Sequence, residues 1–257
     1  MRKKSKKLSD NSIIKPILIL AVVGVAIYFF SKYQHKTQVV ENVTTPPPAQ
    51  TASTISITKE SIKEANFTGT RVIVKGTSKI APIVQNYIDQ TIEDFRKTAN
   101  TDVPEMRQKF GADSSLSKYT IDFEGKYIKS RTTESVIINQ YVYTGGANGL
   151  TIYKVFTISS SDGSLLPLSY MIKPSEQDVF TAYVKKSLIN WRPEGSTTTV
   201  VFPDDVNSLT FASFTDWSLD DKFLTLYFDQ DSIAPGAVGA VAYPLPLTSI
   251  KKFLIER

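Results

Sequence analysis

Residues 78–95, with the sequence SKIAPIVQNYIDQTIEDF, decide the fold class of this chain. Their apolar side chains recur every three or four residues, which is the period of an α-helix with one buried face. Ser78 suits the position before a first turn, and Pro82 suits the first turn itself. The pattern predicts an amphipathic helix over residues 79–99, with a short helix over residues 105–110. The apolar stripe that faces the core consists of Ile80, Ile83, Val84, Tyr87, Ile88, Ile92 and Phe95.

Segments in which polar and apolar residues alternate flank this helix on both sides. Such alternation predicts strands with one buried face. The expected strands cover residues 55–57, 67–74, 119–124, 135–143, 152–158, 208–217, 222–229 and 238–243. Further helices are expected at 178–189 and 247–255, and Asp162-Gly163 is typical of a tight hairpin turn. Together these elements predict an α+β domain over residues 53–257, with helices packed on one side of an antiparallel sheet.

An uncharged apolar run at residues 17–30 precedes the domain. With the isoleucines just before it, the run reaches the lower limit for a membrane-spanning helix, about 17 residues. Basic residues gather before the run, which predicts a cytoplasmic N-terminus and an extracytoplasmic domain on a single-pass membrane protein. We expect a cytoplasmic tail at 1–12, a transmembrane helix at 13–31 and a Pro/Thr-rich stalk at 32–52. A cleaved signal peptide that ends near Gly24-Val25-Ala26 is the alternative.

The charge distribution argues against a nucleic-acid partner. The chain carries a net charge of +5, but eight of its 30 basic residues lie in the first 36 positions, beside a single acid. The remaining 22 basic and 24 acidic residues leave the domain slightly acidic. The basicity therefore belongs to the membrane segment, where it suits anionic lipid.

Cysteine is absent, and His35 is the only histidine. The domain therefore lacks the residues for a Ser-His-Asp or Cys-His arrangement and for a zinc site of Cys and His. We expect no cofactor and no metal. Catalysis would have to rely on carboxylates, and the adjacent acidic pairs are Asp204/Asp205, Asp220/Asp221 and Asp229/Asp231. Solvated turns explain such pairs best. A cation site at Asp229/Asp231 and general acid–base chemistry are the alternatives.

A candidate ligand site follows the strand at 135–143. Tyr143 precedes Gly145 and Gly146, whose lack of a side chain would let backbone amides approach a ligand closely. Asn148 adds an amide to the same turn. We expect Tyr143, Gly145, Gly146 and Asn148 to bind the ligand, although turn geometry explains the glycines equally well.

Three segments of the chain carry a resemblance to a known family. They are Tyr143–Gly149 (YTGGANG), Asp162–Ser169 (DGSLLPLS) and Leu224–Gly239 (LTLYFDQDSIAPGAVG). With them, residues 53–257 resemble a largely uncharacterised extracytoplasmic domain. The lysozyme-sensing anti-sigma factor of Gram-positive bacteria and the N-terminal region of membrane-anchored peptidoglycan deacetylases share that domain.

The resemblance implies a module that binds or senses a cell-envelope component or a secreted protein, such as a lysozyme-like protein or peptidoglycan, and that is not an enzyme. A cell-wall-modifying enzyme that uses carboxylates is the alternative. The chain departs from the family at two positions. Asn148 stands where the family usually has histidine, and Gly236 stands where it often has an aromatic residue.

Overall fold

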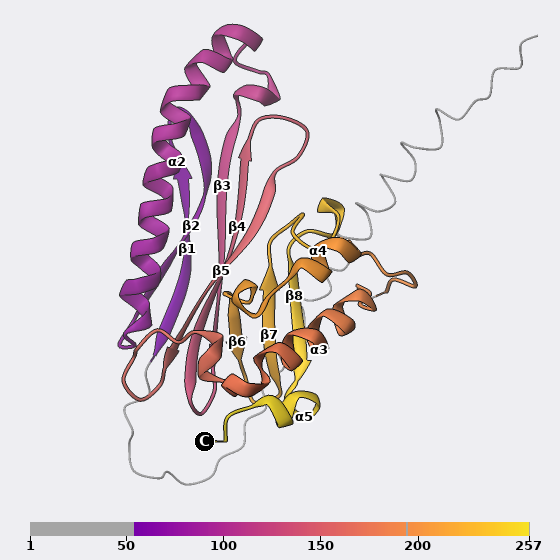
Figure 1. Ribbon diagram of the computed structural model, residues 1–257. Helices are drawn as coiled ribbons and strands as arrows, with labels where there is room; N and C mark the ends of the chain where they lie inside the picture. Colours follow the sequence, from indigo (N-terminus) through magenta and orange to yellow (C-terminus); the bar gives the residue numbers. More distant parts are fainter. Residues whose placement is uncertain (1–53, 194, 257) are drawn as a thin grey trace, which may run out of the picture. The chain divides into compact units, whose positions relative to one another are not determined.

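The computed structural model describes residues 54–193 and 195–256. The N-terminal part contains strands β1 and β2, the long helix α2 and strands β3, β4 and β5 (Figure 1). Their bounds are Ile55–Lys63, Phe67–Gly76, Ile80–Phe110, Tyr119–Lys129, Thr133–Thr144 and Leu150–Ser159. The C-terminal part contains α3 (Gln177–Ile189), α4 (Pro203–Ser208), β6 (Trp217–Leu219), β7 (Phe223–Phe228), β8 (Val241–Pro246) and α5 (Leu247–Ile250). The expected α+β class is confirmed.

The strands form two sheets, and only one of them is antiparallel throughout. The first sheet has the order β1-β2-β3-β4-β5, and the second has the order β6-β7-β8. In the first sheet β2 pairs with β3 in parallel, because α2 carries the chain back to the end at which β2 began. The prediction of an antiparallel sheet is therefore wrong for this pair. At Gly69 a Cβ atom would lie 1.8 Å from the carbonyl oxygen of Ile121, so this close parallel pairing requires glycine.

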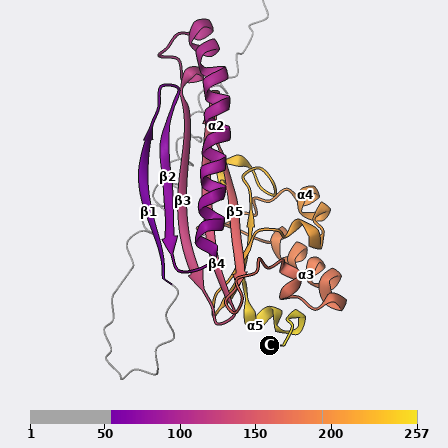
Figure 2. The same ribbon diagram turned by 90° about the vertical axis from the view of Figure 1, so that its left-hand side faces the viewer.

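Helix α2 covers one face of the five-stranded sheet (Figure 2). The expected stripe is mostly buried: Ile80, Val84, Ile88, Ile92 and Phe95 pack against the strands. The helix continues through Pro104 to Phe110. The prediction of two separate helices is wrong because the buried stripe extends over Ala99 and Val103, and this burial outweighs the hydrogen bond that proline cannot donate. The buried sheet residues beneath α2 include Phe67, Val72, Ile121, Phe123, Val136 and Ile138.

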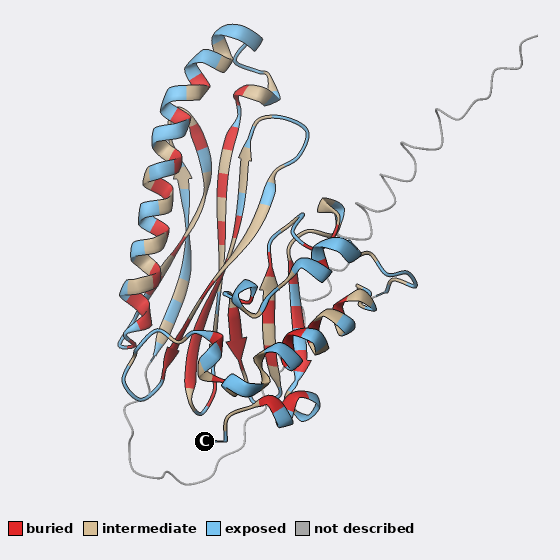
Figure 3. Cartoon of the chain, in the orientation of Figure 1, coloured by how far each residue is buried: buried red, intermediate tan, exposed pale blue. Residues whose placement is uncertain are grey.

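A second core lies under the three-stranded sheet and involves α3, α4 and α5. Its largest fully buried side chains include Phe180, Trp217, Leu224 and Phe253. In Figure 3 strand β6 is coloured as buried, and buried residues alternate with more exposed ones along β7 and β8. The prediction of a single sheet with all helices on one side is therefore wrong in detail. The domain has two sheets, and each sheet packs with its own helices around its own core.

The predicted strand at 208–217 is also wrong. Helix α4 begins at Pro203 and ends at Ser208, where this strand is expected to start, and the two acids after Pro203 suit the positive end of the helix. Residues 211–213 form a 3₁₀ turn with a capping box between Thr210 and Ser213. Only Trp217–Leu219 remains as strand. Strand β8 begins at Val241, later than expected, and its prolines fit because β8 lies at a sheet edge.

The predicted tail, transmembrane helix and stalk lie outside the described residues. Within the described ranges, no helix combines the length and apolar character that a membrane span requires.

Candidate functional site

Side chains from the second sheet cap the free edge of β5. The backbone amides of Thr151, Tyr153 and Val155 donate to Gln230 Oε1 (2.9 Å), Asp229 Oδ1 (2.8 Å) and Asp216 Oδ1 (2.6 Å). The backbone amide of Gln230 in turn donates a hydrogen bond to the Thr151 carbonyl at 2.9 Å. These contacts satisfy edge groups that would otherwise be open to another strand.

The interface between the two sheets is also closed by side chains. The Thr157 hydroxyl donates to the Trp217 carbonyl at 2.6 Å. The rings of Tyr153 and Tyr227 meet edge-on at 5.0 Å. Burial raises the pKa of Tyr153 to about 12, so this phenol stays neutral at physiological pH.

Asp229, Asp231 and Asp220 have structural roles. Asp229 caps β5, while Asp231 adopts a left-handed backbone with a φ of 64° and borders Gly236. Asp220 Oδ1 accepts the amides of Lys222 and Phe223, both at 2.7 Å, which is the turn role that the sequence predicts. Among the described residues, no group of three or more His, Cys, Asp or Glu could hold a metal ion.

Sequence reasoning missed Asp216. Its carboxylate lies 3.2 Å from Lys154 Nζ and also accepts the Val155 amide. No local pattern marks this residue, because its partners lie about sixty positions earlier in the chain.

The expected ligand residues lie in the hairpin loop between β4 and β5. The Tyr143 hydroxyl donates to the Gly146 carbonyl at 2.9 Å, so this side chain closes its own loop. Gly145 has a φ of 86°, and a Cβ there would lie 2.8 Å from the Leu116 carbonyl oxygen. Gly146 faces open space, and Asn148 is exposed. Thus Tyr143, Gly145 and Gly146 shape the loop, and the exposed Asn148 faces solvent.

Exposed apolar side chains flank this loop. Tyr141 lies over Gly149, at which a Cβ would come within 2.3 Å of the tyrosine ring. Tyr141 is 38% exposed and Leu150 is 45% exposed. We call Tyr141, residues 144–149 and Leu150 the loop-end surface. The C-terminal end of α2, where Phe110 is also exposed, lies at the same end of the sheet (Figure 1).

A groove of about 610 Å³ lies between α3 and β8. We call it the aromatic groove. It is lined by Tyr183, Lys186, Ser187, Asn190, Trp191, Arg192 and Tyr243. Of the two tryptophans in the chain, Trp217 is 1% exposed and belongs to the core, whereas Trp191 lines this groove.

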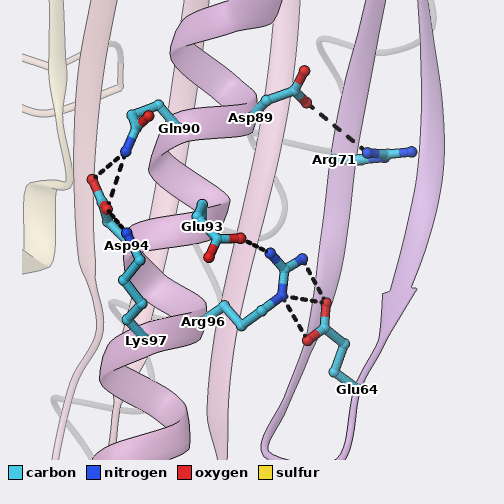
Figure 4. A network of polar contacts seen from close by, with 8 residues as sticks. All are labelled: Glu64, Arg71, Asp89, Gln90, Glu93, Asp94, Arg96 and Lys97. Atoms are coloured by element: carbon cyan, nitrogen blue, oxygen red, sulfur yellow. Dashed lines mark hydrogen bonds and ion pairs between the residues drawn. The ribbon is translucent and has the colours of Figure 1, made fainter.

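A polar hollow of about 590 Å³ lies between β1, β2 and α2, but its charges are largely paired. Arg71 contacts Glu60 and Asp89, at 2.5 and 4.0 Å. Along the same helix Arg96 binds Glu64 and Glu93, and Gln90 and Lys97 both contact Asp94 (Figure 4). The contacts of Arg71 with Asp89 and of Arg96 with Glu64 join α2 to the first hairpin, and the remaining contacts lie within the helix or within the hairpin. All of them have a structural role.

Comparison with known proteins finds a family model that matches part of the C-terminal region. Residues 171–248 match the family described as protein of unknown function (DUF3298). The chain is 21% identical over 248 residues to the peptidoglycan-N-acetylmuramic acid deacetylase PdaC of Bacillus subtilis, covering 94% of this chain and 50% of that protein. The chain thus spans about half the length of this curated relative. The expected resemblance to a domain found in peptidoglycan deacetylases is confirmed.

Two solved structures whose descriptions name the DUF3298 family are similar to this chain. A DUF3298 family member from Bacteroides fragilis has a TM-score of 0.58 at 15% identity, covering 80% of this chain and 94% of that one. A member from Pseudomonas aeruginosa has a TM-score of 0.48 at 14% identity, covering 82% and 95%. The Bacteroides structure supports the fold. All residues that line the aromatic groove fall inside the matched segment, and the loop-end surface falls outside it.

Proposed function

We propose that residues 53–257, whose segment 171–248 matches the DUF3298 family, form a binding and sensing domain on the outer side of a cell membrane. In this proposal the apolar run near the N-terminus anchors the chain, with its basic tail in the cytoplasm. The domain recognises a secreted lysozyme-like protein or another cell-envelope component at the loop-end surface.

The exposed apolar side chains beside a constrained loop carry this proposal. Tyr141 and Leu150 expose apolar surface on opposite faces of the sheet, because Leu150 pairs with Val142, and the exposed ring of Tyr141 adjoins backbone that Tyr143 holds in place. A loop fixed before binding loses less conformational entropy on association, and aromatic side chains contribute strongly to protein interfaces.

The strand register keeps this surface away from the start of the domain. Ile55 pairs with Gly76 at one end of the sheet, whereas Phe67 pairs with Tyr119, and Tyr119 with Thr144, at the other. The described chain therefore begins at the end opposite the loop. A partner can approach the loop from the end of the sheet opposite Ile55.

The carboxylates support binding rather than carboxylate catalysis. Asp229 and Asp216 accept backbone hydrogen bonds from β5, and Asp220 closes a turn. The activity in the name of the deacetylase belongs to a protein of which this chain spans half. We therefore propose no enzymatic role for the domain.

Binding of lysozyme to the full chain in nanodiscs tests the proposal. Tyr141→Ala removes an exposed aromatic ring, and we expect about a tenfold loss of affinity. Val179→Ser is the matched control, because Val179 is a 51% exposed apolar residue on α3, away from the loop. The proposal is wrong if neither lysozyme nor wall fragments bind, or if Tyr141→Ala and Val179→Ser have the same effect.

A further inference from the structure

The aromatic groove combines ring surfaces with hydroxyl groups. Tyr183 and Trp191 are partly buried and pack against the second core, and the Tyr183 ring meets Phe253 at 5.6 Å. Tyr243 is 7% exposed, and its hydroxyl forms a hydrogen bond with that of Ser187. The groove therefore has partly buried aromatic side chains and a polar contact deeper inside. Its volume lies in the range of small-molecule sites, about 300–1,000 Å³.

The polar groups of the groove suit neutral hydrogen bonding. The Tyr243 phenol keeps its proton at physiological pH, because its ordinary pKa of 10.0 is already high and burial raises the pKa further. Asn190 Nδ2 donates to the Lys186 carbonyl at 2.8 Å, which leaves Oδ1 as the atom available to a ligand. Hydroxyl and amide groups next to aromatic rings match the alternating polar and C–H faces of a sugar ring.

Two exposed cations, Lys186 and Arg192, lie at the groove, and no carboxylate of the described ranges lines it. Among the described residues neither cation forms an ion pair, as is also true of other exposed lysines such as Lys63; at the groove, however, the two cations lie next to aromatic rings. A guanidinium presents a planar fork of donors that binds a carboxylate through two hydrogen bonds. A neutral sugar would leave both cations without a partner.

We infer that the aromatic groove binds an acidic sugar, namely a pyranose ring that carries a carboxylate. The ring would lie against Trp191 and Tyr183, and the carboxylate would meet Arg192 with Lys186 beside it. N-acetylmuramic acid has this chemistry, whereas N-acetylglucosamine has the ring without the carboxylate. The inference concerns a surface other than the loop-end surface and does not depend on a protein partner there.

Tryptophan fluorescence of the full chain in nanodiscs gives a direct readout. Trp217 is 1% exposed, so quenching by iodide reports mainly on Trp191. We expect the acidic disaccharide of N-acetylglucosamine and N-acetylmuramic acid to protect Trp191 from iodide. The neutral dimer of N-acetylglucosamine should bind at least about tenfold more weakly, because it lacks one charge-assisted contact. Trp191→Phe should abolish this protection from quenching, and that result would assign sugar binding to the groove.

Charge variants identify the recognition element. Arg192→Gln should weaken binding of the acidic disaccharide about tenfold and leave binding of the neutral dimer unchanged, and Arg192→Lys should restore part of the loss. Lys63→Gln, at an exposed lysine on β1, is the control and should have no effect. Both arginine replacements lie on an exposed residue, so the fold should tolerate them.

Three results would overturn the inference. They are equal affinity for the acidic and neutral sugars, unchanged binding in Arg192→Gln, and binding of poly-glutamate as tight as that of the acidic disaccharide. The last result would assign the groove to acidic peptides. Tyr141→Ala should leave sugar binding intact, so failure at the loop-end surface and failure at the groove are distinguishable.

Discussion

Asp229 lies just after β7, where its carboxylate accepts the amide of Tyr153. Burial raises the pKa of this carboxyl above its ordinary value of 3.8, and the nearby Asp216 acts in the same direction, while the Tyr153 amide lowers it. The folded protein therefore holds this proton more tightly than the unfolded chain does. The contribution of Asp229 to stability falls as the pH rises from near 3.8 through the folded pKa.

Asp229→Asn tests this residue, because an amide oxygen can still accept the Tyr153 amide but cannot ionise. We expect the variant to be more stable than the parent at neutral pH, and the difference to disappear in acid. Urea unfolding at several pH values measures it.

Asp94→Asn is the control, because its effect on stability should have the opposite pH dependence. Hydrogen bonds from Gln90 and then Lys97 lower the pKa of Asp94, so its contribution is present at neutral pH and lost in acid. A neutral-pH loss of stability in Asp229→Asn would mean that burial is not the dominant effect there.

At the scale of elements, α2 is held by its buried stripe rather than by ideal backbone bonding. Pro104 lies in the interior of this 31-residue helix and removes one hydrogen bond. Pro82 lies in the first turn, where the backbone amides have no partner inside the helix. Pro104 therefore destabilises the helix more than Pro82 does.

Pro104→Ala should stabilise the protein, by about 1 kcal/mol or more, because alanine restores the missing bond. Pro82→Ala should change the free energy of unfolding by less than about 0.5 kcal/mol. Chemical denaturation of both variants gives the comparison. A destabilised Pro104→Ala would indicate that packing around Ala99 and Val103 depends on the proline geometry.

At the scale of the whole molecule, the predicted orientation places residues 1–12 and the folded domain on opposite sides of a membrane. The absence of cysteine makes this easy to test, since any introduced thiol is unique. Thr197 is exposed on the domain, and Ser5 lies in the predicted tail.

Thr197→Cys should react with a membrane-impermeant maleimide in intact cells, and Ser5→Cys should react only after permeabilisation. Labelled Thr197→Cys protein should stay with the membrane fraction. Labelling of Ser5→Cys in intact cells, or release of the domain into the medium, would contradict the anchored orientation.

The sequence predicts the hairpin of the candidate site but neither its flanking surface nor the aromatic groove. The hairpin at Tyr143–Gly149 was located correctly, because glycine and asparagine mark turns locally. Its flanking surface at Tyr141 and Leu150 depends on how far each side chain is buried, which the alternation of residues does not reveal. The aromatic groove joins Tyr183 to Tyr243 across sixty positions, so no local spacing could indicate it.

Local sequence patterns suffice to predict the buried stripe of α2, most of the alternating strands and the turns at Asp162-Gly163 and Asp220-Asp221. Each of these rests on periodic burial or on hydrogen bonds within a few residues. The folded arrangement alone reveals the parallel pairing of β2 with β3, the use of Asp216 and Asp229 at the edge of β5, and the groove between α3 and β8. The physical reason is that periodicity tells which face of an element is buried, whereas its neighbours are chosen by contacts between residues far apart in the chain.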